Sequence, residues 1–240
     1  MSSGATAARR WAVIAAAGQS QRMSAELPKQ YLKLCGRTLL ENSLRPFLEC
    51  AGLSGVVVVI APGDSHWQAL PCARERRIRI ARGGSERMHS VLNGLKELAR
   101  EARPDDWVLV HDAARPCLDR GDLERLIATL EHDPVGGILA LPIGDTLKHA
   151  AADGEHVDAT VDRAGFWAAQ TPQMFRFALL ERALTVAVES GSKVTDEAAA
   201  IEALGQQPRL VKGSVRNIKI TRAEDLELAE AILTTMAGRA

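Results

Sequence analysis

The chain has 240 residues, of which 46% are hydrophobic, so it could form one large α/β domain or two small ones around a sizeable core. Lysine plus arginine and aspartate plus glutamate both number 30, and this zero net charge argues against nucleic acid or a membrane surface as a partner. The four cysteines form no Cys-x-x-Cys pair, which argues against a disulfide framework or a zinc ribbon and favours a reducing cytoplasm.

Short apolar runs alternate with longer amphipathic stretches as far as residue 141. The first run, residues 11–17, is too short to span a membrane and predicts a strand. The pattern then predicts, in chain order, a helix at 39–49, strands at 56–61 and 77–81, a helix at 86–100, a strand at 107–111, a helix at 123–132 and a strand at 137–141. This order is typical of parallel βαβ units with helices on both faces. We therefore predict a single α/β domain over residues 1–240, built on a Rossmann-like, doubly wound, mostly parallel sheet.

The stretch from 143 to 163 breaks this rhythm. It is polar and contains two short extended pieces, 145–149 and 156–161, around an Ala-Asp-Gly turn. We expect a projecting β-hairpin arm. A lone two-stranded hairpin is marginal in water, so such an arm usually packs on a partner, most simply a second copy of the chain. The alternative is a mobile loop.

Beyond residue 175 the pattern returns to helices. We predict helices at 177–190 and 197–204, strands at 209–212 and 217–220, and a final helix at 222–236. Thr221, with Glu224 three residues later, matches a capping box and predicts that the last helix begins just after Lys219.

The end of the first predicted strand is the strongest candidate site. Small residues, Ala16 and Ala17, lead into a loop with Gly18 and two cations, Arg22 and Lys29. A glycine turn beyond a strand lets backbone N–H groups approach phosphate oxygens, and cations there suit a triphosphate. The alternative is a solvated surface loop. Neither Gly-x-Gly-x-x-Gly nor a P-loop motif occurs in the sequence.

A second candidate follows the strand predicted at 77–81. Gly83 and Gly84 precede Ser85 and a helix that contains Ser90. Helix N-termini attract anionic groups, and the glycines permit close contact with a base or a ribose. Ser85 could equally be a helix N-cap with nothing bound.

A third candidate ends the strand predicted at 107–111, where an apolar run meets Asp112 and Arg115. An unpaired buried carboxylate is costly, so Asp112 should face a metal, a hydroxyl of a ribose or of an acceptor, or Arg115. The alternative is an Asp112 to Arg115 ion pair that closes a turn. The six histidines show no metal-ligand spacing.

Several short motifs, taken together, resemble those of the methylerythritol phosphate cytidylyltransferases. Their order and spacing over about two hundred residues carry the resemblance. They are Ala16-Ala-Gly18, Arg22-Met23, Pro28-Lys29-Gln30-Tyr31, His111-Asp-Ala-Ala-Arg-Pro116, Thr171-Pro-Gln173, Thr195-Asp-Glu197 and Asn217-Ile-Lys219. The sequence departs from the family's pattern at Ala15, usually proline, Ser20, usually glycine, and Gln21, often basic. These departures bear on the fit of the loop and on CTP affinity.

The resemblance implies a reaction and a set of partners. Members of the family take CTP and 2-C-methyl-D-erythritol 4-phosphate with Mg²⁺ and release pyrophosphate and the CDP-linked alcohol, a step of non-mevalonate isoprenoid synthesis. The protein is expected to be a homodimer held by the hairpin arm.

The resemblance also implies residue roles. Arg22 and Lys29 would stabilise the transition state. The nucleotide would be held by Ala16, Ala17, Gly18, Gly84, Ser85, Ser90 and Ala113. The acceptor would be bound by Asp112, Arg115, Thr146, Arg163, Thr171, Thr195 and Lys219. Arg163, together with Thr146, would reach into the neighbouring subunit's site, and Arg163 and Lys219 would join the catalytic set.

Other interpretations stay open. A ribitol 5-phosphate cytidylyltransferase would look similar across the nucleotide half, and turnover with both acceptors separates the two. A catalytically silent nucleotide-binding dimer would keep the fold without the reaction, although retention of Lys29 and Arg22 counts against it. An NAD-dependent oxidoreductase is disfavoured by the broken glycine fingerprint.

Overall fold

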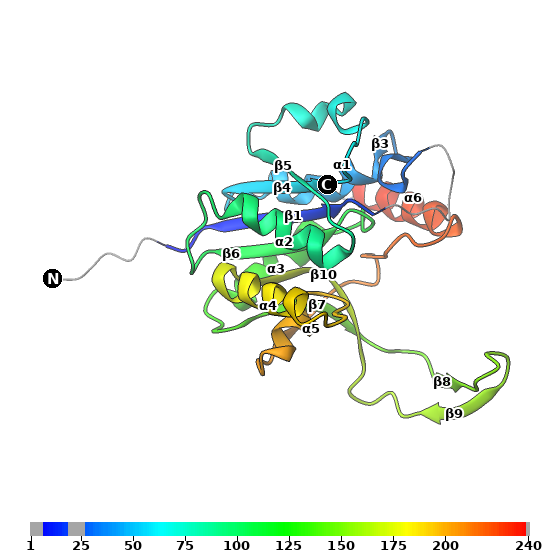
Figure 1. Cartoon of the computed structure of the whole chain (residues 1–240). Coiled ribbons are helices and arrows are strands. Elements are labelled where there is room, and N and C mark those ends of the chain that lie inside the picture. Colours follow the sequence, from blue (N-terminus) through cyan, green and yellow to red (C-terminus); the bar gives the residue numbers. More distant parts are fainter. Residues whose placement is uncertain (1–6, 19–26, 239–240) are drawn as a thin grey trace.

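The computed structural model describes residues 7–18 and 27–238 and has a seven-stranded sheet at its centre (Figure 1). The strands stand in the order β11-β7-β10-β6-β1-β4-β5. Their bounds are β1 (Arg10–Ala16), β4 (Gly55–Ile60), β5 (Ile78–Arg82), β6 (Trp107–Asp112), β7 (Gly136–Pro142), β10 (Trp167–Arg176) and β11 (Arg209–Lys212). All neighbours are parallel except β10, which runs antiparallel to both β6 and β7.

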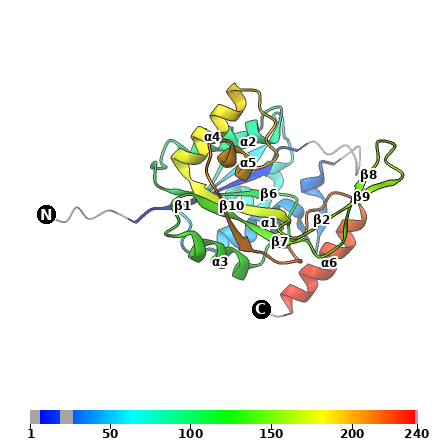
Figure 2. The ribbon, with the colours of Figure 1, turned by 90° about the horizontal axis from the view of Figure 1, so that it is seen from below.

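Helices cover both faces of this sheet, because alternate side chains of a strand point to opposite sides. On β1, Ala12 and Ile14 join the core under α1 (Leu39–Glu49) and α3 (Arg120–Leu130). Trp11 and Val13 point the other way and join a second core. That core lies under α2 (Arg87–Leu98), α4 (Phe177–Glu189) and α5 (Glu197–Ala203) (Figure 2). The predicted doubly wound α/β sheet is confirmed.

A third, smaller core closes one end of the molecule. It unites Leu34 and Leu39 with Ile220, Ala229 and Leu233. The last two belong to α6 (Glu224–Ala237), and the first lies in a short hairpin of β2 (Lys33–Leu34) and β3 (Arg37–Thr38). Three short 3-10 turns complete the described elements, η1 (Lys29–Tyr31), η2 (Trp67–Ala69) and η3 (Pro71–Arg74). The chain near residue 29 is thus packed against the chain near residue 220.

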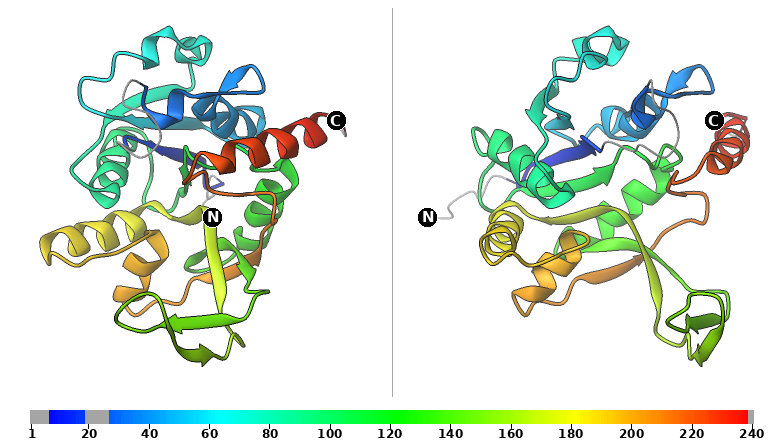
Figure 3. Two further views of the ribbon diagram at one scale, coloured as in Figure 1. Left: turned by 90° about the vertical axis from the view of Figure 1, so that its right-hand side faces the viewer. Right: turned by 45° about the vertical axis from the view of Figure 1, so that its right-hand side comes forward.

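The predicted hairpin is present and projects from the body (Figures 1 and 3). Its strands are β8 (Leu147–Ala150) and β9 (Val157–Val161), which pair antiparallel as a separate two-stranded sheet. Val157 is 63% exposed and Phe166, at the base of the arm, is 50% exposed. Its role in dimerisation stays a prediction.

Strand β10 was not expected, and the strand predicted at 217–220 is wrong. In the sequence, the polar run Gln170–Gln173 interrupts the hydrophobic pattern expected of a strand at β10. The pairing of β10 with β7 also shifts register between Ala169 and Gln173. Residues 217–220 instead form an irregular segment. Asn217 donates from Nδ2 to the Thr171 carbonyl (2.8 Å), and Ile220 N donates to the Ala114 carbonyl (2.8 Å). These side-chain and loop hydrogen bonds therefore hold residues 217–220 in place of the regular backbone hydrogen bonds of a β-strand.

The predicted Thr221 cap is also wrong. Helix α6 begins at Glu224, and no side chain caps it. The Asp225 carboxylate accepts hydrogen bonds from Thr221 N, Thr221 Oγ1 and Arg222 N at 2.7, 3.0 and 2.8 Å. Because the Thr221 hydroxyl donates to Asp225, the threonine holds the turn before the helix rather than its first N–H groups.

Candidate active site

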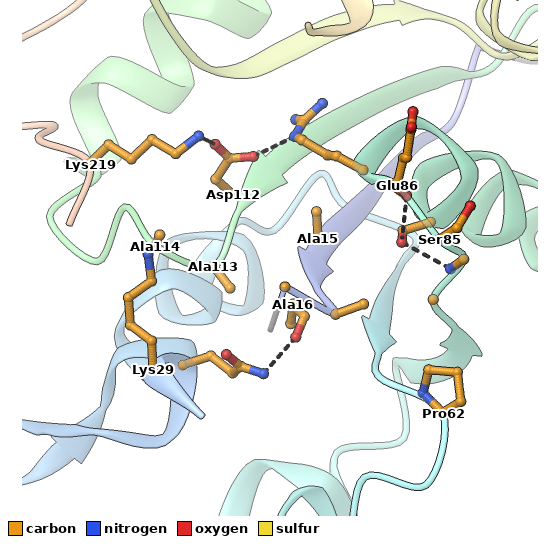
Figure 4. A pocket seen from close by; sticks show the side chains of 17 residues that line it. Ala15, Ala16, Lys29, Pro62, Ser85, Glu86, Asp112, Ala113, Ala114 and Lys219 are labelled. Carbon is orange, nitrogen blue, oxygen red and sulfur yellow. Dashed lines mark hydrogen bonds and ion pairs between the residues drawn. The ribbon is translucent and has the colours of Figure 1, made fainter. Parts of the chain in front are cut away.

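A pocket of about 730 Å³ opens beyond the carboxyl ends of β1, β4 and β6 (Figure 4), where open α/β sheets bind ligands. Figure 4 shows Lys29, Asp112 and Lys219 along one side, with Ser85 and Pro62 opposite. The lining residues are Ala15, Ala16, Ala17, Gly18, Lys29, Gln30, Pro62, Gly83, Gly84, Ser85, Glu86, Arg87, Ser90, Asp112, Ala113, Ala114 and Lys219.

Lys29 reaches the pocket from a firmly held turn. Gln30, the next residue, donates from Nε2 to the Ala16 carbonyl at 2.8 Å, and the Tyr31 hydroxyl donates to Asp64 Oδ2 at 2.8 Å. Lys29 Nζ donates to the Ile220 carbonyl at 2.7 Å. Burial and then the nearby Lys219 ammonium lower the pKa of Lys29. The Lys29 ammonium is therefore positioned by a neutral carbonyl oxygen in a partly buried site.

The glycines before α2 are required by close packing. A Cβ on Gly83 would lie 2.3 Å from Cβ of Ala17, and one on Gly84 would lie 2.4 Å from Cβ of His89. The Gly84 N–H donates to Ser90 Oγ at 3.0 Å. Glu86 holds the N-cap position without a side-chain cap, so the interpretation of Ser85 as a cap is wrong. Ser85 is exposed at the pocket wall.

Asp112, the last residue of β6, sits between two cations. Its Oδ1 accepts from Arg87 Nε at 2.9 Å and its Oδ2 accepts from Lys219 Nζ at 2.7 Å (Figure 4). Burial would raise the pKa of Asp112, but these two cations outweigh burial and hold the pKa well below its usual range. The alternative of an Asp112 to Arg115 ion pair is wrong, because Arg115 donates to the carbonyls of Asn217 (2.7 Å) and Ala169 (3.3 Å).

A buried histidine supports Asp112 from behind. His111 Nε2 lies 3.1 Å from the Arg115 carbonyl and Nδ1 lies 2.9 Å from Thr171 Oγ1. Burial lowers the pKa of His111 to about 4, so the ring is neutral at neutral pH. A carbonyl can only accept, so Nε2 carries the hydrogen and Nδ1 accepts from the Thr171 hydroxyl. Thr171 Oγ1 in turn accepts from Asp112 N at 3.1 Å.

Comparison with known proteins places this chain in a family. A family model described as IspD, 2-C-methyl-D-erythritol 4-phosphate cytidylyltransferase, matches residues 11–235. The chain belongs to this family. A relative of that name from Pseudomonas entomophila (strain L48) is 58% identical over 218 residues, which cover 90% of this chain and 92% of the relative. The chain is accordingly a cytidylyltransferase, as the resemblance predicted.

Solved structures of the family have the same fold. A crystal structure of a 4-diphosphocytidyl-2C-methyl-D-erythritol synthase matches with a TM-score of 0.82 and 38% identity, covering 94% of this chain and 99% of the other. A 2-C-methyl-D-erythritol 4-phosphate cytidylyltransferase from Francisella tularensis matches with a TM-score of 0.82 and 36% identity, covering 94% of this chain and 100% of the other.

The pocket brings together most of the residues that the family resemblance assigned. Those that line it are Ala16, Ala17, Gly18, Lys29, Gly84, Ser85, Ser90, Asp112, Ala113 and Lys219. Arg115 and Thr171 are buried just behind it and hold Lys219's segment and Asp112. Thr146, Arg163 and Thr195 are exposed elsewhere, the first two on or beside the arm. Arg22, Ser20 and Gln21 lie outside the described residues.

Sequence reasoning assigned no role to Arg87 or Glu197, although Glu197 stood in the Thr195-Asp-Glu197 motif. Arg87 lines the pocket and binds Asp112. Its Nη1 and Nη2 also donate to the two carboxylate oxygens of Glu197, at 2.6 and 3.0 Å. The only signal for Arg87 in the sequence was a basic residue at the start of a predicted helix that follows two glycines.

In the part of the chain that is described, no helix has the length and apolar character to cross a membrane.

Proposed function

We propose that the protein joins the cytidylyl group of CTP to 2-C-methyl-D-erythritol 4-phosphate, releasing pyrophosphate and 4-diphosphocytidyl-2-C-methyl-D-erythritol, in cytoplasmic isoprenoid precursor synthesis. The observation that carries this proposal is the meeting of Lys29, Asp112 and Lys219 in one pocket of a chain that belongs to this family. The pocket faces the glycine-rich start of a 12-residue helix, α2, whose N-terminus suits anions.

The nucleotide half lies over β1 and the start of α2. The turn at Ala16, Ala17 and Gly18 offers backbone N–H groups to phosphate oxygens. On the facing wall the N–H groups of Gly83 and Gly84 donate to the Ile60 carbonyl and to Ser90 Oγ, so these glycines contribute space for the nucleotide rather than hydrogen bonds to it. Ser90 fixes Gly84 through its hydroxyl. Ser85 and Ala113 then border the space for ribose and base. Arg22 would add a further cation to this half.

The acceptor half lies around Asp112 and Lys219. Lys219 suits the acceptor's phosphate, and the Asp112 carboxylate suits its hydroxyls. Arg115 and Thr171 act from behind the pocket wall, the first by holding the Asn217 carbonyl and the second by accepting from Asp112 N. This assignment keeps Arg115 and Thr171 in the acceptor site as supports.

The chemistry needs charge neutralisation more than proton transfer. An oxygen of the acceptor's phosphate bonds to the α-phosphorus of CTP, and the bond from that phosphorus to the β-phosphate oxygen breaks. The attacking phosphate is already anionic near neutral pH, so no general base is required. Among the described residues no carboxylate forms an ion pair with Lys29. Its charge is therefore available to phosphoryl oxygens in the transition state.

Magnesium fits the pocket as an ion carried mainly by the nucleotide. Mg²⁺ prefers oxygen ligands, keeps several waters, and often binds one or two carboxylates beside substrate phosphates. Glu86 lines the pocket and would supply such an oxygen, whereas both carboxylate oxygens of Asp112 are engaged by Arg87 and Lys219. In the described ranges no group of three or more His, Cys, Asp or Glu side chains could hold a metal by itself. Bound there, the ion would neutralise phosphate charge.

The arm is proposed to hold a homodimer and to complete the partner's site. Thr146 and Arg163 flank the β8 and β9 hairpin and are exposed in the single chain. Val157, Phe166 and Trp167 add exposed apolar surface in the same region, at 63, 50 and 38%. Such surface on a projecting hairpin suits burial against a second copy.

The test is pyrophosphate release by purified protein with CTP, Mg²⁺ and 2-C-methyl-D-erythritol 4-phosphate. ATP and UTP replace CTP in one control, and ribitol 5-phosphate replaces the acceptor in another. We expect release that depends on CTP and on the methylerythritol acceptor. Faster pyrophosphate release with ribitol 5-phosphate would make ribitol 5-phosphate the preferred acceptor. No pyrophosphate release from protein that still binds CTP would favour a catalytically silent nucleotide-binding dimer.

A further inference from the structure

Four side chains of alternating charge run from the buried start of α5 into the pocket. Glu197 binds Arg87 through both carboxylate oxygens, Arg87 binds Asp112, and Asp112 binds Lys219. The side chain of Glu197 is 0% exposed and that of Lys219 is 44% exposed. The row therefore connects a group sealed in the core to the open acceptor half of the pocket.

Glu197 itself has almost no freedom to move. It is the first residue of α5, whose N-cap is Asp196. Asp196 accepts from Ala199 N at 2.9 Å and from Gln173 Nε2 at 2.8 Å, and Gln173 Oε1 accepts from Ala198 N at 2.8 Å. The start of α5 is thereby fastened to β10. A carboxylate held this firmly can fix the plane of the guanidinium that it binds.

The geometry of Arg87 decides how Asp112 is presented. Burial would lower the pKa of Arg87, but Glu197 and Asp112 outweigh burial and raise it, so the guanidinium is always charged. Because Glu197 occupies both terminal nitrogens, Arg87 meets Asp112 through Nε alone. Oδ2 of Asp112 is then left to face Lys219. Without Glu197, the Arg87 fork could rotate and bind Asp112 or an incoming phosphate through two nitrogens.

We propose that Glu197 is a positioning residue for the acceptor half of the pocket, acting on Asp112 through Arg87. This inference rests on the proposed function, in which Asp112 binds the acceptor. Glu197 touches neither substrate, and its contribution is the orientation of Asp112 toward Lys219. It gives the last residue of the Thr195-Asp-Glu197 motif a role that its spacing in the sequence does not indicate.

Glu197→Gln tests this inference, because glutamine keeps the size and one acceptor oxygen but removes the charge and the second acceptor. We expect kcat/KM for the acceptor to fall about tenfold or more, since misplacement by about 1 Å can cost up to a hundredfold. KM for CTP should change by less than about threefold, because in the proposed assignment Asp112 contacts the acceptor and not CTP. Adding Glu197→Gln to Asp112→Asn should cost little beyond Asp112→Asn alone, because both act through one group.

Asp106→Asn is the matched control. Asp106 lies just before the opposite end of β6 and its side chain is 1% exposed. It accepts from Arg9 Nε at 3.1 Å and from Trp11 Nε1 at 3.0 Å. Its loss should lower the melting temperature, while kcat/KM for both substrates stays within about twofold where the variant is folded. Comparing Asp106→Asn with Glu197→Gln therefore separates the loss of stability expected from any buried carboxylate from a specific loss of kcat/KM for the acceptor.

Two results would overturn the inference. One is acceptor kcat/KM within about twofold of wild type in folded Glu197→Gln, and the other is an equal loss for both substrates that multiplies with Asp112→Asn. If Glu197→Gln does not fold, Glu197→Asp keeps the charge but withdraws it by one methylene, and the same acceptor-selective loss is expected. Absence of pyrophosphate release by wild type would instead count against the proposed function.

Discussion

The charge of Lys29 is held by a neutral carbonyl, and this has a kinetic consequence. Lys29→Ala should lower kcat about a hundredfold or more, roughly 2.7 kcal/mol of transition-state stabilisation, with folding intact. Arg22→Ala should do the same on the basis of the sequence. Lys33→Ala is the control, because Lys33 is exposed on the neighbouring strand β2 and should leave the rate unchanged. A near-normal rate in either test variant would remove that residue from its role.

His111 predicts how stability depends on pH. The folded state lowers the pKa of His111 from 6.5 to about 4 through burial. The unfolded chain therefore binds the proton first as the pH falls, so stability is full above pH 6.5 and is lost toward pH 4, by at most about 3 kcal/mol. Asp112, whose pKa is held below 3.8, loses its contribution only at lower pH.

The measurement is the urea concentration at the midpoint of unfolding, determined at several pH values between 7 and 4. His111→Gln should be less stable at pH 7 but should show a flatter decline between pH 6.5 and 4. His132→Gln, at an exposed position, should keep the wild-type slope. An unchanged slope in His111→Gln would show that the buried imidazole does not set the acid sensitivity.

Residues that act through neighbours in the chain could be predicted, and residues paired across the fold could not. The position of Lys29 after an apolar strand pointed to phosphate chemistry, and that of Gly84 pointed to contact with a base or a ribose. Both residues line the pocket. Arg87 and Glu197 are 110 residues apart and meet only because the starts of α2 and α5 lie close together. No local pattern encodes that meeting. Arg115 was assigned to the acceptor, but its guanidinium is engaged by backbone carbonyls.

At the scale of elements, α2 must lie very close to the sheet to bring Gly84 and Arg87 to the pocket. Gly94 makes this approach possible, because a Cβ there would lie 2.7 Å from Val13 Cγ1 and 3.0 Å from Val59 Cγ2. Valine side chains are stiff, so neither can withdraw without moving a strand.

Gly94→Ala should therefore be destabilising. Alanine gains about 1 kcal/mol of helix propensity over glycine, but overpacking against stiff neighbours costs about 1–3 kcal/mol. We expect a net loss of up to about 2 kcal/mol in denaturant unfolding. Lys96→Ala, at an exposed position of the same helix, should stay within about 0.5 kcal/mol. A more stable Gly94→Ala would mean that the helix can lift without cost.

The parallel elements were predictable from their apolar runs, while β10 and the segment before α6 were not. Buried strands such as β4, which reads Gly-Val-Val-Val-Val-Ile, carry a continuous signal. In β10 the buried residues include Gln170, Thr171 and Gln173, whose side chains bind other segments. A pattern of hydrophobicity reports none of these partners. The same holds for Asp225, whose capture of Thr221 displaced the expected cap.

At the scale of the whole molecule, the arm gives the dimer proposal a direct test. Arg163→Ala should raise KM for the acceptor and leave KM for CTP nearly unchanged, since the side chain would bind the acceptor across the interface. Sedimentation should show that the wild-type protein is a dimer. An equal effect on both substrates, or a monomeric wild type of full activity, would contradict the proposal.

Mixing two defective variants sharpens that prediction. In a hybrid of Lys29→Ala and Arg163→Ala subunits, one site would combine an intact Lys29 with an intact Arg163 from the other subunit. Random exchange makes about half of the dimers hybrids, so about a quarter of all sites should regain wild-type activity. Mixtures no more active than the sum of the separate variants would place Arg163 in its own subunit's site or outside any site.

The hydrogen bond from Lys29 to the Ile220 carbonyl joins positions that are 191 residues apart. Contacts of such separation form late, because a long loop must close before they contribute. During synthesis the early strands can pair and their helices can dock, yet the wall that carries Lys219 does not exist until the residues around position 219 have left the ribosome. A chain truncated before residue 217 would thus retain its glycine turns and Lys29 but lack one wall of the pocket, so partial products of translation would carry no catalysis.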